Sequence, residues 1–310
     1  MTSFPPSFEH PGPPSARPEL PAGVDRPPVR PRGSIPRGTP ERSDLPAWPA
    51  WSPFAAMLLT LVIAIAGATV ISVIVQLGGV DITANHTPPG VQIGGTIIQD
   101  LALILAAVVF AKVTDGTVTA WQFGLRRVRI GPAIGWTALV WMLFLVFSAV
   151  YASLVDAPEV SNQADELGAG ESTLNLIAVG VLVTVIAPLA EEFFFRGFMF
   201  TALRRWVGWV AGAVGTGAVF ALIHTGSVDA IFLPALCVLG LLLCVLYHRT
   251  GSLLPCIALH ALNNSIALGE SQDFSTGGTV ATMLGATAVV VSLGLLAARS
   301  PRLNTAPAAA

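Results

Sequence analysis

Residues 174–205 read LNLIAVGVLVTVIAPLAEEFFFRGFMFTALRR, a long apolar run with three charges near its middle, Glu191, Glu192 and Arg196. About twenty apolar residues cross the hydrocarbon core of a bilayer as a helix. Strand alternation is absent, and lipid cannot satisfy the open backbone groups of a strand. We therefore interpret the run as a membrane-spanning helix. Because it exceeds one crossing, its Arg204-Arg205 end is expected to extend into the interface.

The whole chain has the composition of a membrane protein. Of its 310 residues 53% are hydrophobic and 11% are charged, and the mean hydropathy is +0.71. A soluble domain carries about 25% charged residues, so the bilayer is the expected solvent. The sequence predicts an all-α, polytopic bundle of about eight transmembrane helices, at residues 53–78, 92–112, 132–154, 174–205, 208–225, 229–248, 252–269 and 277–298.

Both ends of the chain differ from this apolar body. Fourteen of the 24 prolines and six arginines fall in residues 1–50, which predicts a disordered cytoplasmic tail. Residues 51–300 are then the transmembrane domain, and residues 301–310 a short disordered C-terminal tail. Cys237, Cys244 and Cys256 lie in apolar segments, where they act as small hydrophobic side chains and give no sign of disulfides.

The basic residues predict the orientation. Cytoplasmic loops near spans are enriched in Lys and Arg. Eight spans with the tail inside place fifteen of the sixteen basic residues on the cytoplasmic side. We therefore expect an integral protein of the plasma (cell) membrane with both termini cytoplasmic. The opposite loops contain only acidic charges: Asp81, Asp156, Glu159, Asp165, Glu166, Glu171, Asp229, Glu270 and Asp273.

The remaining basic residue, Arg196, lies inside the fourth span with two glutamates. Charges at membrane depth cost roughly 2.5 to 3.5 kcal/mol each, so they are usually paired, inward-facing and functional. Glu192 and Arg196 are spaced i, i+4 and share a helix face, which predicts a buried ion pair. Glu191 points elsewhere, is free to face a cavity, and is the candidate general base.

Two later segments add polar residues at the same helical spacing. Phe220 and His224 end the fifth span, and His260 and Asn264 lie on one face of the seventh. Glu191 and His224 are each about 25 Å from a turn near Gly208, so they are expected at one depth. His260 is about 14 Å from its own turn, and it joins them if the first hairpin protrudes further into the cytoplasm.

These residues resemble, in order, the three motifs of the CPBP family, which groups CAAX prenyl proteases with bacterial self-immunity and bacteriocin-processing proteins. The motifs are Glu191-Glu192-Phe-Phe-Phe-Arg196-Gly197, Phe220-x-x-x-His224 and His260-x-x-x-Asn264, and Phe-Gly-Leu-Arg at 123–126 is also similar. The resemblance covers residues 170–270. It implies a catalytic core that forms an intramembrane endopeptidase, with Glu191, His224, His260 and Asn264 lining a membrane-embedded cavity.

The implied chemistry leaves two versions open. In one, Glu191, Glu192 and their neighbours act without a metal: Glu191, with His224, deprotonates a water that attacks a scissile amide, and His260 with Asn264 stabilises the oxyanion. In the other, His224 and His260 bind a divalent metal such as zinc, although the spacing His-Glu-x-x-His is absent. Either version predicts a membrane-associated protein or peptide as substrate, the CAAX-type prenylated class among them, and no nucleic acid.

Other interpretations of the same residues stay open. Glu192 with Arg196 could serve packing alone, and His260 with Asn264 could be an interhelical hydrogen-bonded pair. The chain could then be a catalytically idle scaffold or immunity protein that binds a partner in the bilayer. A transporter would also place acids and histidines inside spans, but no inverted repeat is seen. The polar pair Gln99-Asp100 in the second span is left outside the predicted site.

Overall fold

The computed structural model describes residues 45–83, 87–116, 118–155 and 163–299. Most of the predicted N-terminal tail and the whole C-terminal tail therefore lie outside the described residues. Residues 45–50 are described, and they correct the predicted tail boundary. Leu45 and Trp48 are buried, and the Trp48 ring lies 4.9 Å from that of Phe123 and 5.0 Å from that of Phe198. The packed body thus begins before residue 51.

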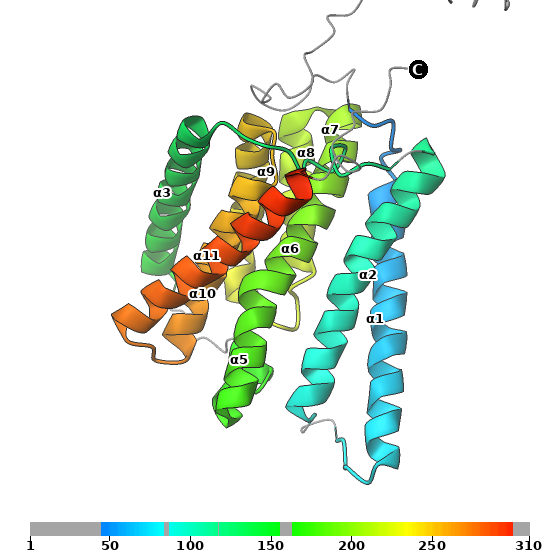
Figure 1. Ribbon diagram of the computed structural model, residues 1–310, viewed down its shortest axis with the longest axis vertical. Coiled ribbons are helices and arrows are strands. Elements are labelled where there is room, and N and C mark those ends of the chain that lie inside the picture. Colours follow the sequence, from blue (N-terminus) through cyan, green and yellow to red (C-terminus); the bar gives the residue numbers. More distant parts are fainter. Residues whose placement is uncertain (1–44, 84–86, 117, 156–162, 300–310) are drawn as a thin grey trace, which may run out of the picture. The chain divides into compact units, whose positions relative to one another are not determined.

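Each segment predicted to span the membrane is helical, and the described residues contain no strand (Figure 1). Within them, six helices are long and apolar enough to cross a membrane. The predicted fifth segment, α8, has 14 residues, and the seventh, α10, has 18. The helical membrane bundle is confirmed, and the count of eight is approximate. The helices are α1 (Ser52–Leu77), α2 (Pro89–Asp115), α3 (Ile130–Leu154), α4 (Gln163–Glu166), α5 (Thr173–Val181), α6 (Ala187–Glu192), α7 (Thr201–Val207), α8 (Trp209–Leu222), α9 (Leu233–Thr250), α10 (Leu254–Ser271) and α11 (Thr276–Arg299).

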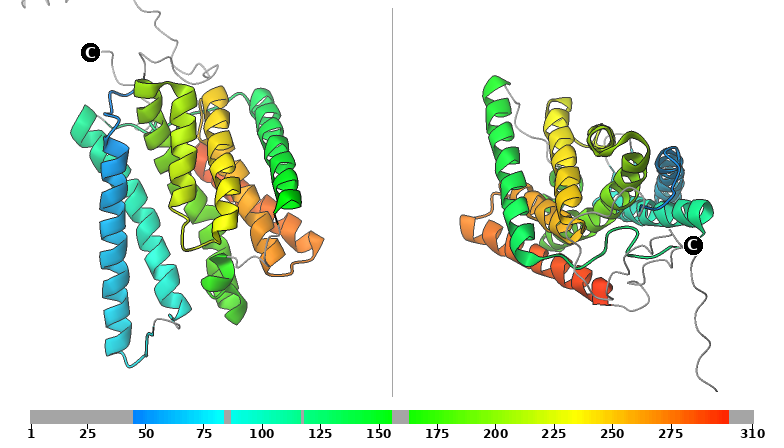
Figure 2. Two further views of the ribbon diagram at one scale, coloured as in Figure 1. Left: turned by 180° about the vertical axis from the view of Figure 1, so that it is seen from behind. Right: turned by 90° about the horizontal axis from the view of Figure 1, so that it is seen from above.

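The fourth predicted span, residues 174–205, lies within one continuous helix, residues 173–207, that occupies the middle of the bundle. It runs from α5 through α6 to α7, with π-helical segments at Leu182–Ile186 and Phe193–Phe200. Around it, α1 packs along α2, α8 along α9 and α10 along α11 (Figures 1 and 2). Its charged middle therefore faces other helices on several sides.

The Arg204-Arg205 end of this helix does more than extend toward the interface. Arg205 Nη1 donates to the Leu45 carbonyl (2.7 Å), and Trp206 Nε1 donates to the Trp48 carbonyl (2.8 Å). These bonds fix the segment that leads into α1. The end of α7 is thus a docking site for the chain before the first span.

Two glycines let α8 and α9 approach closely beside the charged helix. A Cβ on Gly217 would lie 2.7 Å from the Cys237 carbonyl oxygen, and one on Gly240 would lie 3.0 Å from the Gly217 Cα. Small residues allow such backbone contact between membrane helices. This close approach brings the α9 backbone within reach of Arg196.

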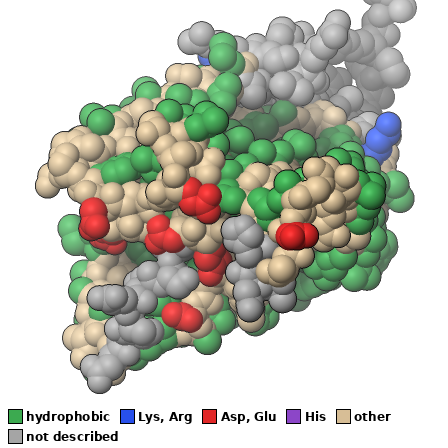
Figure 3. Space-filling view, turned by 90° about the horizontal axis from the view of Figure 1, so that it is seen from below, with side chains coloured by type: hydrophobic (Ala, Val, Ile, Leu, Met, Phe, Trp, Pro, Cys, Tyr) green, Lys and Arg blue, Asp and Glu red, His purple; other side chains and the backbone are tan. Residues whose placement is uncertain are grey.

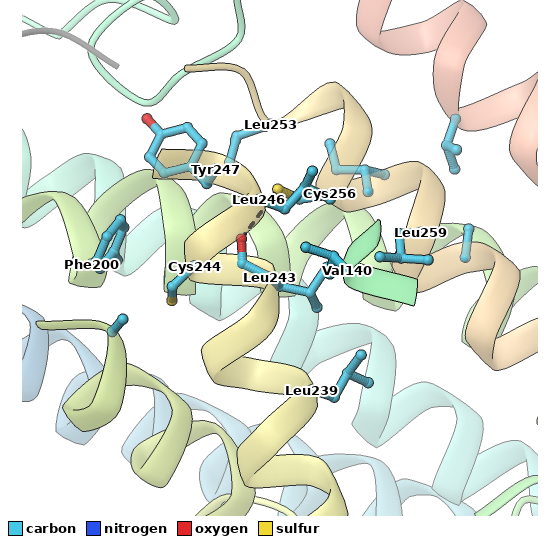
Figure 4. Packing of buried hydrophobic residues seen from close by; sticks show 14 of the residues in the cluster. Val140, Phe200, Leu239, Leu243, Cys244, Leu246, Tyr247, Leu253, Cys256 and Leu259 are labelled. Atoms are coloured by element: carbon cyan, nitrogen blue, oxygen red, sulfur yellow. Dashed lines mark hydrogen bonds between the residues drawn. The ribbon is translucent and has the colours of Figure 1, made fainter. Parts of the chain in front are cut away.

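The interior of the bundle is apolar and closely packed. One buried cluster joins α3, α9 and α10, and Figure 4 shows Leu243, Cys244 and Cys256 among its members. Cys256 Sγ lies 3.5 Å from the Leu243 carbonyl, and all three cysteines are free, as predicted. By contrast, α1, α3 and α11 expose many large apolar side chains, as expected for helices in lipid.

Candidate active site

The local path of the central helix is set by Pro188. Proline has no N–H to donate within a helix. One residue earlier, the Ala187 N–H donates to the Leu182 carbonyl, five residues back, which is the π-helical pattern. The Val183 carbonyl therefore does not receive its regular helical hydrogen bond: the Ala187 N–H donates to Leu182, and Pro188 has no N–H. It accepts instead from Asn264 Nδ2 of α10, at 2.9 Å. The helix irregularity thus anchors one of the predicted site residues.

Glu192 and Arg196 form the predicted ion pair. Arg196 Nη1 lies 2.6 Å from Glu192 Oε1, and both side chains are 0% exposed. Arg196 Nη2 also donates to the Gly240 carbonyl of α9, at 3.0 Å. The pair therefore neutralises two charges inside the membrane and ties the central helix to α9.

Glu192 also holds a histidine from another helix. His260 Nδ1 lies 2.8 Å from Glu192 Oε1. Since a carboxylate oxygen only accepts, Nδ1 carries the proton and Nε2 is the ring nitrogen left for other partners. His260 is 3% exposed, so its orientation is fixed by this one bond and by packing. The hydrogen bond from α10 to Glu192 is a contact that helical spacing within one segment could not predict.

Glu191, the adjacent residue, has a different environment. Its Oε2 lies 3.7 Å from His260 Nε2, and the side chain is 12% exposed. Among the described residues, Oε2 has no hydrogen-bond partner although it is buried. Glu192 Oε2 also lacks one, but Glu192 is fully enclosed and its other oxygen is already shared between Arg196 and His260. Glu191 is therefore the carboxylate that lines the cavity and has an unsatisfied oxygen.

His224 is held by its own helix. Its Nδ1 lies 2.7 Å from the Phe220 carbonyl, so Nδ1 donates and Nε2 is left free, as in His260. The Phe220 ring packs against both histidines, with ring centroids 4.9 Å from His224 and 5.8 Å from His260. Phe220 and His224, which share a helix face by their i, i+4 spacing, are thus in contact, and Phe220 also contacts His260.

One cavity of about 210 Å³ joins these residues. Glu191, His224, His260 and Asn264 all line it, so the predicted meeting of three segments at one depth is confirmed. Asn263 lines it too, and its Nδ2 donates to Asn264 Oδ1 at 3.3 Å. The chemical role of each residue stays a prediction.

The structure adds two residues that the sequence interpretation left out. Gln99 and Asp100 of α2 line the same cavity, and Asp100 is 2% exposed. Their signal was visible in the sequence as a polar pair within an apolar span. In the sequence alone, an internal hydrogen-bond network explains such a pair equally well.

The metal-dependent version gains no support from the arrangement of side chains. Across the described ranges, no group of three His, Cys, Asp or Glu residues is placed to hold a metal ion. His224 and His260 would need at least one further protein ligand for a zinc site.

Comparison with known proteins agrees with the motifs. Residues 173–266 match the family model described as type II CAAX prenyl endopeptidase Rce1-like, which confirms the predicted CPBP resemblance. An uncharacterized 24.3 kDa protein of Escherichia coli is 30% identical over 148 residues, which are 46% of this chain and 65% of that protein. The chain thus spans somewhat less than two thirds of this relative. No solved structure matches the chain.

Proposed function

We propose that this protein is an intramembrane endopeptidase that hydrolyses a peptide bond in a membrane-associated protein or peptide. The observation that carries the proposal is the contrast between two adjacent carboxylates. Glu192 is hydrogen-bonded to Arg196 and His260, whereas Glu191 Oε2 has no hydrogen-bond partner among the described residues, and Glu191 borders a cavity with two histidines and an asparagine. The family match of this segment to endopeptidases supports the same conclusion.

A water molecule between Glu191 and His260 would be the nucleophile. The two facing atoms are 3.7 Å apart, which lets one water contact both at hydrogen-bond distances of about 2.8 Å. Glu191 takes a proton from this water while the water oxygen bonds to the scissile carbonyl carbon. When the C–N bond breaks, Glu191 gives that proton to the leaving amine, which balances the reaction.

The neighbouring polar groups would stabilise the tetrahedral intermediate. The Asn264 carboxamide has two N–H bonds, and only one is used by the Val183 carbonyl, so the second can reach an oxyanion. His260, whose Nε2 lies 3.7 Å from Glu191 Oε2, borders the same space and is the second candidate for this role. His224 Nε2 is the remaining candidate to orient the water or to assist proton transfer.

The substrate class follows from the setting of the cavity and from the family match. A cavity inside a helical membrane bundle suits a polypeptide that is itself attached to or inserted in the membrane. The matched family adds prenylated C-terminal segments as a candidate class. The sequence of the present chain contains no feature that selects one substrate.

The deciding experiment compares the termini of membrane proteins across the proteome of the native host. Cells with the wild-type protein are compared with cells that express Glu191→Gln or Glu270→Gln at equal levels. Glu270 is exposed at the end of α10, so it gives a matched change of carboxylate to amide outside the cavity. We expect a specific set of termini to vanish in Glu191→Gln and to persist in Glu270→Gln.

The same experiment separates the proposal from its main rival. If both variants keep the wild-type termini while deletion of the gene still produces a phenotype, the protein acts as a scaffold and the proposal is wrong. If Glu270→Gln also loses the termini, the effect is not specific to the cavity.

A further inference from the structure

A polar stripe runs along one face of α2. Gln92, Thr96, Gln99 and Asp100 are spaced i, i+4, i+7 and i+8, so they share one side of an otherwise apolar helix. Polar groups inside a span are costly and usually face a cavity or a pathway. The stripe starts near the first turn of α2 and ends at Asp100 in the catalytic cavity. It therefore links the end of the helix to the candidate active site.

A second hollow follows this stripe. It has a volume of about 450 Å³, and we call it the α1–α2 groove. It shares the lining residues Thr96 and Gln99 with the catalytic cavity, so the two hollows adjoin at these residues. Leu61 and Ile65 of α1 form part of its wall and are 54% and 59% exposed. Since α1 and α2 lie at one edge of the bundle, the groove borders the lipid (Figures 1 and 2).

Where the α1–α2 groove adjoins the catalytic cavity, some polar side-chain groups make no hydrogen bond to the described residues. Gln92 Nε2 donates to the Thr87 carbonyl, and Thr96 Oγ1 donates to the Gln92 carbonyl. The Gln99 side chain is exposed and makes no hydrogen bond to any described residue. Asp100 Oδ2 is buried and likewise has no partner in the described part of the chain. The unused groups lie where the groove meets the catalytic cavity.

We propose that the α1–α2 groove admits an extended segment of a membrane-inserted polypeptide to Glu191, and that Gln99 binds the backbone of this segment. The inference rests on the proposed function. A peptide bond must leave its helix before it can be hydrolysed, and an unwound backbone in lipid has unsatisfied N–H and C=O groups. A carboxamide both donates and accepts, so it matches a peptide group, while the apolar α1 wall receives side chains.

Site-specific photo-crosslinking tests the position of the substrate directly. A photo-crosslinking phenylalanine derivative replaces Gln99 in the full-length Glu191→Gln protein, which leaves substrate uncut, in native membranes. The matched control replaces Leu101, two residues away on α2, which is 59% exposed and lines neither hollow. We expect adducts at position 99 at least tenfold above those at 101. Their peptides should map within a few residues of the termini that only the wild type produces.

The outcomes distinguish this inference from the proposed function. If the wild-type termini are real but position 99 gives no more adducts than position 101, the function stands and the groove is not the route. If adducts at position 99 come from proteins whose termini never change, the inference is wrong as well. Absence of any Glu191-dependent termini refutes the proposed function and this inference together.

Activity variants provide a second test that does not depend on crosslinking. Gln99→Leu should lower cleavage of a substrate identified by its termini about fivefold, the effect of one lost hydrogen bond of about 1 kcal/mol, and Gln99→Asn should restore most of it. Ile65→Trp narrows the groove and should lower cleavage further. Val70→Trp is the matched control, because Val70 is 57% exposed on the same helix and outside the groove. Equal cleavage in both tryptophan variants would contradict the proposed route.

Discussion

Glu191 and Glu192 are adjacent in the chain and both lie beside His260, but the rest of their surroundings differ. Glu192 is bonded to Arg196 and His260, and it is completely enclosed. Glu191 lines the cavity with an oxygen that has no partner among the described residues. Since adjacent helix residues point about 100° apart, one helix can give one carboxylate to structure and the other to chemistry.

This division predicts opposite effects of two substitutions. Arg196→Leu leaves Glu192 buried without its main partner, and we expect it to lower the free energy of unfolding by about 3 kcal/mol or more. Glu191→Gln removes a carboxylate oxygen that makes no hydrogen bond to a described residue and lies 3.7 Å from His260 Nε2, so it should change stability far less than Arg196→Leu while it abolishes cleavage. Thermal unfolding in detergent micelles, followed beside cleavage, measures both. Equal melting temperatures for the two variants would show that the pair is not structural.

Much of this site could be predicted from the sequence, because spacing within a helix determines which side chains share a face. The Glu192–Arg196 pair and the convergence of Glu191 with His224 and His260 were predicted in this way. The hydrogen bond from His260 to Glu192 was not predicted, since it depends on how α10 is rotated against the central helix. Gln99 and Asp100 were left outside the predicted site, because a polar pair within a span fits an internal hydrogen-bond network equally well, and only the packing of α2 shows that both line the cavity.

At the scale of elements, the helix boundaries lie close to those predicted from the sequence. The departures from regular helix geometry were not predicted. The span predicted at 174–205 is a helix from residue 173 to 207, but it includes two π-helical segments. Whether a turn bonds five residues back instead of four depends on tertiary contacts as well as on sequence. Pro188 was visible in the sequence, yet its consequence, a carbonyl of Val183 that accepts from Asn264, needed the packed structure.

We therefore expect Pro188 to lower the stability of the central helix and to help position Asn264 in the site. Pro188→Ala restores an N–H and removes a steric conflict that costs about 3 kcal/mol in a regular helix. We expect an equal or higher melting temperature together with cleavage reduced about tenfold, because Asn264 would lose its fixed acceptor. The measurement is thermal unfolding and cleavage on the same preparation. Wild-type cleavage in a stabilised Pro188→Ala protein would show that the irregular turn does not position Asn264.

Charge separates the two ends of the whole bundle. Figure 3 shows acidic side chains gathered on the end seen from below; the described exposed residues there are Asp81, Asp165, Glu166, Glu171, Asp229, Glu270 and Asp273. The catalytic cavity lies toward this end, because Ala164, Val228 and Phe232 of the acidic-end segments line it. If basic loops are cytoplasmic, as the charge distribution predicts, the cavity faces away from the cytoplasm.

The orientation of the bundle can be measured with introduced cysteines. Glu270→Cys places an exposed thiol at the acidic end and Arg127→Cys places one at the opposite end, while native Cys244 and Cys256 are buried and the wild type gives the background. We expect a membrane-impermeant maleimide to label Glu270→Cys in intact cells, and Arg127→Cys only after permeabilisation. That result would favour substrates cut near the outer leaflet over prenylated cytoplasmic C-termini. The reverse labelling pattern would turn the cavity toward the cytoplasm and restore the prenylated class as the first candidate.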